Sequence, residues 1–196
     1  MAKKLRFSTS GTRMRRALFR KVAAYEVDTI DRFRAHVRDA AAAQQHSIQR
    51  RAEKLPAEAR ELLAEDLNEL DVISDFADEL AIVALYRVVE INRGRILVRK
   101  FPAAPSRMAS YIDRLRTFLK QQGVVLDHIA HHRAVEELRL LNNAIKHDAG
   151  YVSAELASKY PRWKQGAKLA GLGAAYERLK GRVPTYILRF AQRIKL

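Results

Sequence analysis

The chain has 196 residues, 48% of them hydrophobic, with no cysteine and a formal net charge of +15 at pH 7. The hydrophobic fraction argues against a disordered chain, and the missing cysteines exclude disulfides, thiolate metal sites and cysteine nucleophiles. Only eight glycines and five prolines interrupt the sequence, which favours helices over a strand-and-turn fold.

The first half of the chain is predicted to form a basic arm and two long helices. Residues 1–12 are basic and turn-rich, and we expect a flexible arm there. Between Arg13 and Lys54 there is no glycine or proline, and apolar residues recur at helical spacing, which predicts one long helix. Pro56 stops this helix and opens a second, expected over residues 57–100.

The second long helix carries a sustained apolar seam. Apolar residues recur there every three or four positions, which is typical of helical bundles and coiled coils. Acids dominate its first half and bases its end, an order that suits the helix dipole. The seam consists of Leu63, Leu67, Leu70, Ile73, Ala77, Leu80, Ala84, Val88 and Ile91.

Shorter helices are predicted over the rest of the chain. Ser106 is expected to cap a third helix that Gly123 ends. A fourth is expected over residues 128–147, and Ser153 is the predicted cap of a short fifth segment.

These elements predict an all-α fold, an elongated up-and-down helical bundle with two long spine helices. Residues 13–160 are expected to form the bundle, and residues 161–196 a basic C-terminal helical segment.

The excess positive charge lies at the two ends of the sequence. Residues 1–25 hold eight basic residues and no acid, whereas residues 159–196 hold ten basic residues and one acid. Such ends favour a polyanionic partner, most often nucleic acid, although they could also serve only solubility. A membrane-surface role is disfavoured, because these segments lack a broad apolar face. The residues expected to bind nucleic acid are Lys3, Lys4, Arg6, Arg13, Arg15, Arg16, Arg20, Lys21, Arg162, Trp163 and Lys164.

Trp163 stands between two of these bases and has two interpretations. An aromatic side chain among cations can stack on an unpaired base. The alternative, which we favour, is that it anchors the C-terminal segment in the core.

No targeting or membrane segment is recognised. The N-terminal bases are not followed by an apolar stretch of the kind found in secretory signals. The longest strongly apolar run, residues 80–86, is far shorter than the roughly 20 residues of a membrane span. We expect a cytoplasmic protein.

Polar residues that could carry chemistry gather at the end of the fourth predicted helix. On a helix, His147, Asn143 and Glu136 share one face, and Lys146 and Arg139 lie on the neighbouring strip. The alternative is that Asn143 and His147 only cap the helix end.

This cluster resembles the signature of the HEPN superfamily, whose members are helical bundles that often dimerise. That motif is an Arg, then Asn, His or Asp, three free positions and a His near a helix end. Asn143 and His147 match its second and last positions, and Asn142 stands where the family has Arg. The resemblance covers about residues 57–160. It implies a homodimer that binds RNA and cleaves it without a metal, in a toxin–antitoxin or antiviral defence system.

RNA cleavage of this kind needs a proton carrier and a cation. Histidine has a pKa suited to the first role, and a positive charge must stabilise the phosphate in the transition state. Asn142 has no charge, so the cation must come from Arg139, Lys146 or a partner subunit. The expected catalytic residues are His147, Asn143, Arg139 and Lys146. The competing hypothesis is a non-enzymatic module that binds a partner protein through its seam and nucleic acid through its ends.

A second polar cluster consists of Asp127, His128, His131 and His132. Two of these histidines have the offset that can hold a metal on one helix face. No third ligand at a clear spacing completes the site, and a solvated helix start is favoured. No metal and no cofactor are expected.

Overall fold

The computed structural model describes residues 9–104 and 108–196, and these form helices and connecting loops. No strand forms within the described ranges; a single isolated bridge joins Tyr151 and Lys168. The predicted all-α class is therefore confirmed. The helices are α1 (Thr9–Ala52), α2 (Ala57–Lys100), α3 (Ile112–Gln121), α4 (His132–His147), α5 (Ala154–Lys159), α6 (Leu172–Lys180) and α7 (Arg182–Arg193), with 3-10 turns η1 (Met108–Ser110) and η2 (Leu126–His128).

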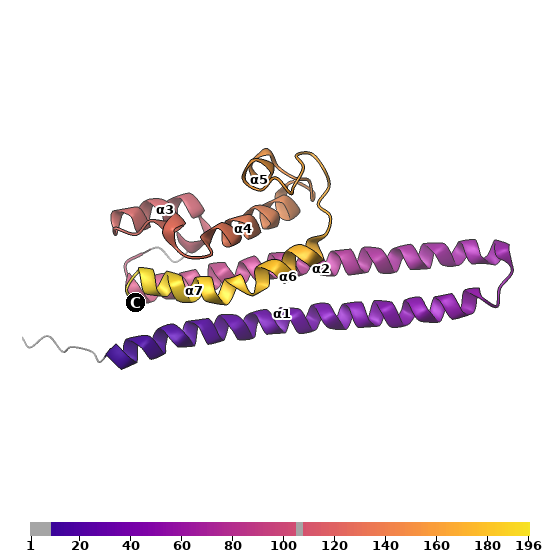
Figure 1. Cartoon of the computed structure of the whole chain (residues 1–196), viewed down its shortest axis with the longest axis horizontal. Helices are drawn as coiled ribbons and strands as arrows, with labels where there is room; N and C mark the ends of the chain where they lie inside the picture. Colours follow the sequence, from indigo (N-terminus) through magenta and orange to yellow (C-terminus); the bar gives the residue numbers. More distant parts are fainter. Residues whose placement is uncertain (1–8, 105–107) are drawn as a thin grey trace, which may run out of the picture.

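The two long spine helices are present as predicted. α1 and α2 each contain 44 residues and lie antiparallel, forming one long hairpin (Figure 1). α2 has the expected bounds, because Pro56 precedes its first residue. α1 begins at Thr9, so residues 9–12 of the expected arm are helical. Lys3, Lys4 and Arg6, with the rest of that arm, lie outside the described residues.

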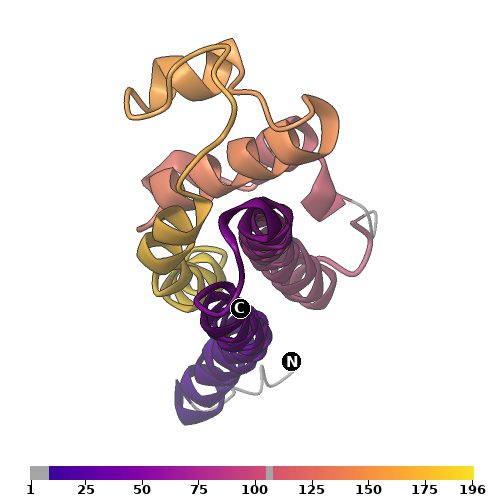
Figure 2. The same cartoon turned by 90° about the vertical axis from the view of Figure 1, so that its right-hand side faces the viewer.

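The remaining helices cover only one half of this hairpin. α6 and α7 run along α1 and α2, and α3 and α4 lie on another side of α2 (Figures 1 and 2). The main core lies where these helices meet. Its fully buried side chains include Ile82, Leu85, Val89, Ile96, Leu138, Leu141, Ile187 and Phe190.

The other half of the hairpin is a pair of helices with a small core of its own. Ala41 and Ile48 of α1 pack there with Leu63 and Leu70 of α2. The predicted seam is therefore only partly buried. Ile73 is 49% exposed, because the apolar surface on this part of α2 is wider than α1 alone can cover, and Leu80, at the start of the covered half, is 39% exposed.

A buried charge network marks the boundary between the two halves. Arg34 of α1 binds Asp78 of α2 and Glu177 of α6, and the first two side chains are each 7% exposed. Gly173 of α6 leaves room for this network, since a Cβ at that position would overlap Oδ2 of Asp78.

The shorter helices follow the prediction at their ends better than at their starts. Gly123, with a φ of 72°, lies just beyond the end of α3, whereas the expected cap Ser106 lies outside the described residues. α4 ends at His147 as predicted but begins four residues late, because His131 has a φ of 67°. The hydroxyl of Ser153 accepts a hydrogen bond from the amide of Leu156 at 3.2 Å, which confirms the predicted cap.

Candidate nucleic-acid interface

The two basic ends of the sequence meet at one end of the molecule. α7 packs along the first half of α1 (Figure 1). Nε of Arg16 donates a hydrogen bond to the carbonyl oxygen of Leu196 at 2.9 Å. The basic end of α2 joins them, since Nζ of Lys100 donates to the carbonyl oxygen of Lys195 at 3.0 Å. Three segments far apart in sequence thus form one basic surface.

A groove of about 580 Å³ separates α1 from α7 on this surface. We call it the α1–α7 groove; it is lined by Thr12, Arg13, Arg16, Ala17, Arg20, Leu188 and Gln192. Arg13 and Arg20 are exposed and make no hydrogen bond or ion pair within the described part of the chain. Two guanidinium groups are therefore available to an anion lying in the groove.

The structure brings together part of the predicted set of nucleic-acid-binding residues. Arg13, Arg16 and Arg20 line the groove, and the exposed Arg15 and Lys21 lie on the same helix.

The C-terminal members of the predicted set lie elsewhere, in the loop between α5 and α6. Arg162 and Lys164 are exposed there. Trp163 packs against the main core, and its indole Nε1 donates to Oε1 of Glu137 at 2.9 Å. This is the anchoring role that we favoured for Trp163.

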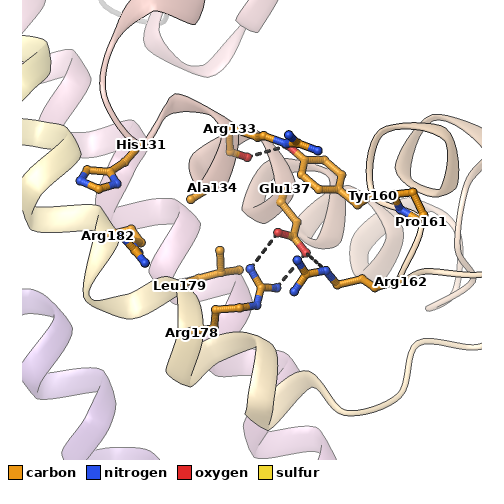
Figure 3. Close-up of a pocket in the computed structure, with 10 residues that line it drawn as sticks. All are labelled: His131, Arg133, Ala134, Glu137, Tyr160, Pro161, Arg162, Arg178, Leu179 and Arg182. Atoms are coloured by element: carbon orange, nitrogen blue, oxygen red, sulfur yellow. Dashed lines mark hydrogen bonds and ion pairs between the residues drawn. The ribbon is translucent and has the colours of Figure 1, made fainter.

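A second hollow, of about 550 Å³, lies beside this loop (Figure 3). We call it the arginine pocket. Its residues come from the start of α4, the loop after α5, α6 and the start of α7. They are His131, Arg133, Ala134, Glu137, Tyr160, Pro161, Arg162, Arg178, Leu179 and Arg182.

Glu137 organises the arginine pocket from its buried position on α4. Its carboxylate, 3% exposed, accepts hydrogen bonds from both terminal nitrogens of Arg178, at 2.9 and 2.8 Å. Nε of Arg162 lies 3.7 Å from the same carboxylate. Figure 3 shows Glu137 between these two arginines. The carboxylate is thus fully engaged, and it fixes the planar fork of Arg178.

Arg133 forms another wall of the pocket with Tyr160. The Tyr160 hydroxyl donates to the carbonyl oxygen of Arg133 at 2.6 Å, and the guanidinium lies 5.7 Å from the ring centroid. Burial raises the pKa of Tyr160 to about 12, so the hydroxyl keeps its proton. The guanidinium groups of Arg133 and Arg182 are not hydrogen-bonded or ion-paired to any described residue.

Sequence reasoning missed Arg133, Arg178 and Arg182. The spacing of four between Arg178 and Arg182 is a weak signal, and Gly181 interrupts the helix between them.

In the middle of α4, Arg139 is bound to carboxylates. Its Nε and terminal nitrogen donate to Glu136 at 3.0 and 2.9 Å, and the terminal nitrogen also reaches Glu155 at 3.1 Å. Lys159 binds the same two acids at 3.1 and 2.7 Å. Burial acts to raise the pKa of Glu136, but Arg139 and Lys159 outweigh it and lower that pKa to about 2. Arg139 therefore belongs to a closed ionic network.

The other expected catalytic residues lie at the surface. His147 and Lys146 are exposed, and neither makes a hydrogen bond or ion pair with a described residue. Oδ1 of Asn143 accepts a long hydrogen bond from Nδ2 of Asn142, at 3.4 Å. The backbone amides of residues 148 and 150 both donate to the carbonyl oxygen of Ala144 in the last turn of α4.

The histidine cluster before α4 forms no metal site in the part of the chain that the structure describes. His132 is buried, with Nε2 at 2.9 Å from Oδ1 of Asp127. Burial, and then the charge of Arg93, lower the pKa of His132 to about 4 despite the attraction of Asp127. His132 is therefore neutral at pH 7.

Comparison of the chain with protein-family models, curated proteins and solved structures finds no match. The resemblance to the HEPN superfamily thus stays a prediction. Among the described helices, none has the length and apolarity needed to cross a membrane.

Proposed function

We propose that the protein binds nucleic acid, with RNA preferred, through the α1–α7 groove. The observation that carries the proposal is the meeting of the two basic ends of the sequence at this groove. Arg13 and Arg20, on one side of the groove, have no counter-ion among the described residues. On the other side, α7 lines the groove with Leu188 and Gln192, within a segment, residues 182–196, that holds four basic residues and no acid. A phosphate backbone is the polyanion that such a groove suits.

The distribution of charge along the hairpin supports binding over mere solubility. Residues 63–77 of α2, in the uncovered half, carry five acids and no base. The three basic segments that meet beside the groove lie at the opposite end of the molecule, whereas the tip of the hairpin has bases of its own, Arg50, Arg51 and Lys54. Charge that served solubility alone would not need to be separated in this way, whereas a separated charge orients an approaching polyanion.

The finer expectations come from the resemblance to the HEPN superfamily. It favours RNA over DNA and a homodimer acting in toxin–antitoxin or antiviral defence; the cytoplasmic location is a separate expectation from the sequence. A ribonuclease is the second candidate function, favoured by one observation. Lys146 and His147 are adjacent, exposed and unpaired within the described residues, so a cation and a proton carrier are both accessible. Arg139 is a weaker source of the cation, because Glu136 and Glu155 bind it.

Fluorescence anisotropy with a labelled single-stranded RNA tests the binding proposal. The affinity should fall steeply between 50 and 200 mM salt, roughly in proportion to the phosphate contacts made. The double variant R13Q/R20Q should bind at least about tenfold more weakly, with a salt slope smaller by about two. The matched control is Arg32→Gln, which removes an exposed charge that pairs with Asp28 elsewhere on α1. Salt-independent binding, or no binding at low salt, would contradict the proposal.

The ribonuclease candidate has a separate test. His147→Ala should abolish RNA cleavage while RNA affinity stays unchanged, because His147 lies outside the groove. Cleavage by the purified variant at the wild-type rate would remove this candidate and leave the binding proposal intact.

A further inference from the structure

We propose that the arginine pocket binds a phosphate monoester, either the terminal phosphate of a nucleic-acid strand or that of a free nucleotide. The strand-end form rests on the nucleic-acid binding proposed above, whereas the pocket itself is argued from its own charges and shape.

The pocket holds more positive charge than its carboxylate can balance. Four arginines line it, and Glu137 is its only acid. Arg178 takes both oxygens of that acid, and Arg162 approaches it only to 3.7 Å. Arg133 and Arg182 find no counter-ion in the described chain. Like charges gathered in one hollow repel each other, and an anion placed among them removes that repulsion.

The shape of the pocket favours a compact anion with several free oxygens. Its volume of about 550 Å³ lies within the range of small-molecule sites. A phosphate monoester carries up to two charges and three free oxygens, enough to meet several guanidinium groups at once. An internal phosphodiester has one charge and chain on both sides, so it is better served by an open groove.

Two of the arginines are held in place before any ligand arrives. The buried Glu137 fixes Arg178, and Arg133 lies over the ring of Tyr160. Fixed donors lose less entropy on binding, which raises affinity for a matching anion.

α7 connects the pocket with the α1–α7 groove. Arg182 at its start lines the pocket, and Gln192 near its end lines the groove. Ten residues of helix separate them, about 15 Å. A strand whose end sits in the pocket can thus continue along α7 into the groove.

The only tryptophan of the chain provides a direct readout of the pocket. Trp163 donates its indole hydrogen to Glu137, which lines the pocket. Titration with adenosine 5′-monophosphate should therefore change the intrinsic fluorescence of the wild type. The double variant R133Q/R182Q should lose this response, and Arg32→Gln should keep it. The side chains of Arg133 and Arg182 are exposed and make no hydrogen bond or ion pair with a described residue. Circular dichroism of R133Q/R182Q should therefore show an unchanged fold.

A second arm compares three RNAs of one sequence, bearing a 5′-phosphate, a 3′-phosphate or no terminal phosphate. If the pocket takes a strand end, one phosphorylated RNA should bind at least about tenfold more tightly than the unphosphorylated RNA. R133Q/R182Q should remove this difference, whereas R13Q/R20Q should weaken all three RNAs equally. A fluorescence response to the monophosphate with equal RNA affinities supports the pocket and assigns it to a free nucleotide.

The pocket proposal and the function proposal fail in different ways. Equal affinity for the three RNAs, together with no response to the monophosphate, overturns the pocket and leaves salt-dependent RNA binding standing. A response to the monophosphate without RNA binding at low salt overturns the function and supports the pocket.

Discussion

The two halves of the α1–α2 hairpin have the same secondary structure and very different surroundings. Arg34 and Asp78 mark the boundary. In the covered half, residues 78–100 of α2 pack against α1, α4, α6 and α7. In the bare half, residues 57–77 of α2 pack mainly against α1, and those nearest the boundary line a hollow with the start of α6 (Figure 1). The difference follows from the width of the apolar surface, because a helix that is apolar on several faces needs several partners.

The charge of the hairpin also differs on the two sides of the boundary at Arg34 and Asp78. The covered half carries the basic surface, the groove and the arginine pocket, whereas residues 63–77 carry five acids. The half with the richer core thus also holds both proposed sites. A rigid scaffold fixes the positions of arginines from several elements, which a pair of helices cannot do.

The largest expected effect is at the boundary itself. Asp78→Ala leaves Arg34 buried beside Glu177 alone, and removing one partner of a buried ion pair costs about 3–5 kcal/mol. Urea denaturation should show this loss, and the covered and bare halves should then unfold less cooperatively. Asp75→Ala, at an exposed acid one turn earlier, should change stability by less than about 0.5 kcal/mol. Equal effects of the two substitutions would show that the network does not join the halves.

A pair of leucine substitutions compares the two cores directly. Leu85 in the covered half is 0% exposed and belongs to the main core, so Leu85→Ala should cost about 3–5 kcal/mol of global stability. Leu70 in the bare half belongs to a cluster of four buried residues. Leu70→Ala should cost about 2 kcal/mol, with faster amide exchange confined to the bare half. An equal loss of global stability from Leu85→Ala and Leu70→Ala would mean that the hairpin unfolds as one unit.

A pH effect is expected from the covered half, at His132. Burial lowers its pKa to about 4, whereas the unfolded chain has a histidine pKa near 6.5. Between these values the unfolded state binds the proton more readily, so stability falls as the pH drops from about 6.5 to about 4. The loss should reach up to about 3 kcal/mol.

Denaturant unfolding of His132→Gln, repeated across that pH range, checks the assignment. The variant should show a flatter profile than the wild type. Glu136, whose pKa is lowered to about 2, loses its contribution at lower pH, as the pH falls from about 4.5 toward 2. If the free energy of unfolding of His132→Gln depends on pH as steeply as that of the wild type, the pH dependence belongs to another group.

The sequence predicted those features of the fold that depend on local pattern. Both spine helices follow from apolar periodicity, and Pro56 fixes the start of α2. The late start of α4 could not be predicted from local pattern, because His131 has a positive φ, which non-glycine residues rarely adopt. The same limit applies to exposed members of the seam, such as Ile73, whose burial depends on which helices reach it.

The two candidate sites differ in the same way: the groove could be predicted from local sequence, whereas the arginine pocket depends on tertiary packing. Arg13, Arg16 and Arg20 follow each other on one helix, so composition alone pointed to them. The arginine pocket draws on residues up to 51 positions apart with no fixed spacing, and only the packing of α4 against α6 and α7 brings them together.

The smallest expected effect is on the bare half, at Phe76. Its side chain is 57% exposed and lines a hollow of about 370 Å³ beside residues 168–172. Val72, one turn before it, is 67% exposed. Since little apolar surface is buried at this position, Phe76→Ser should change the free energy of unfolding by less than about 0.5 kcal/mol.

Urea midpoints measured at several protein concentrations give this last prediction a second readout. If α2 is bare in solution, the midpoints of the wild type and of Phe76→Ser should not depend on concentration. A loss above about 1 kcal/mol that grows with concentration would mean that a second copy covers this stripe. The comparison between the halves would then hold only for the single chain, and the expected homodimer would have its contact on the acidic half, far from the groove.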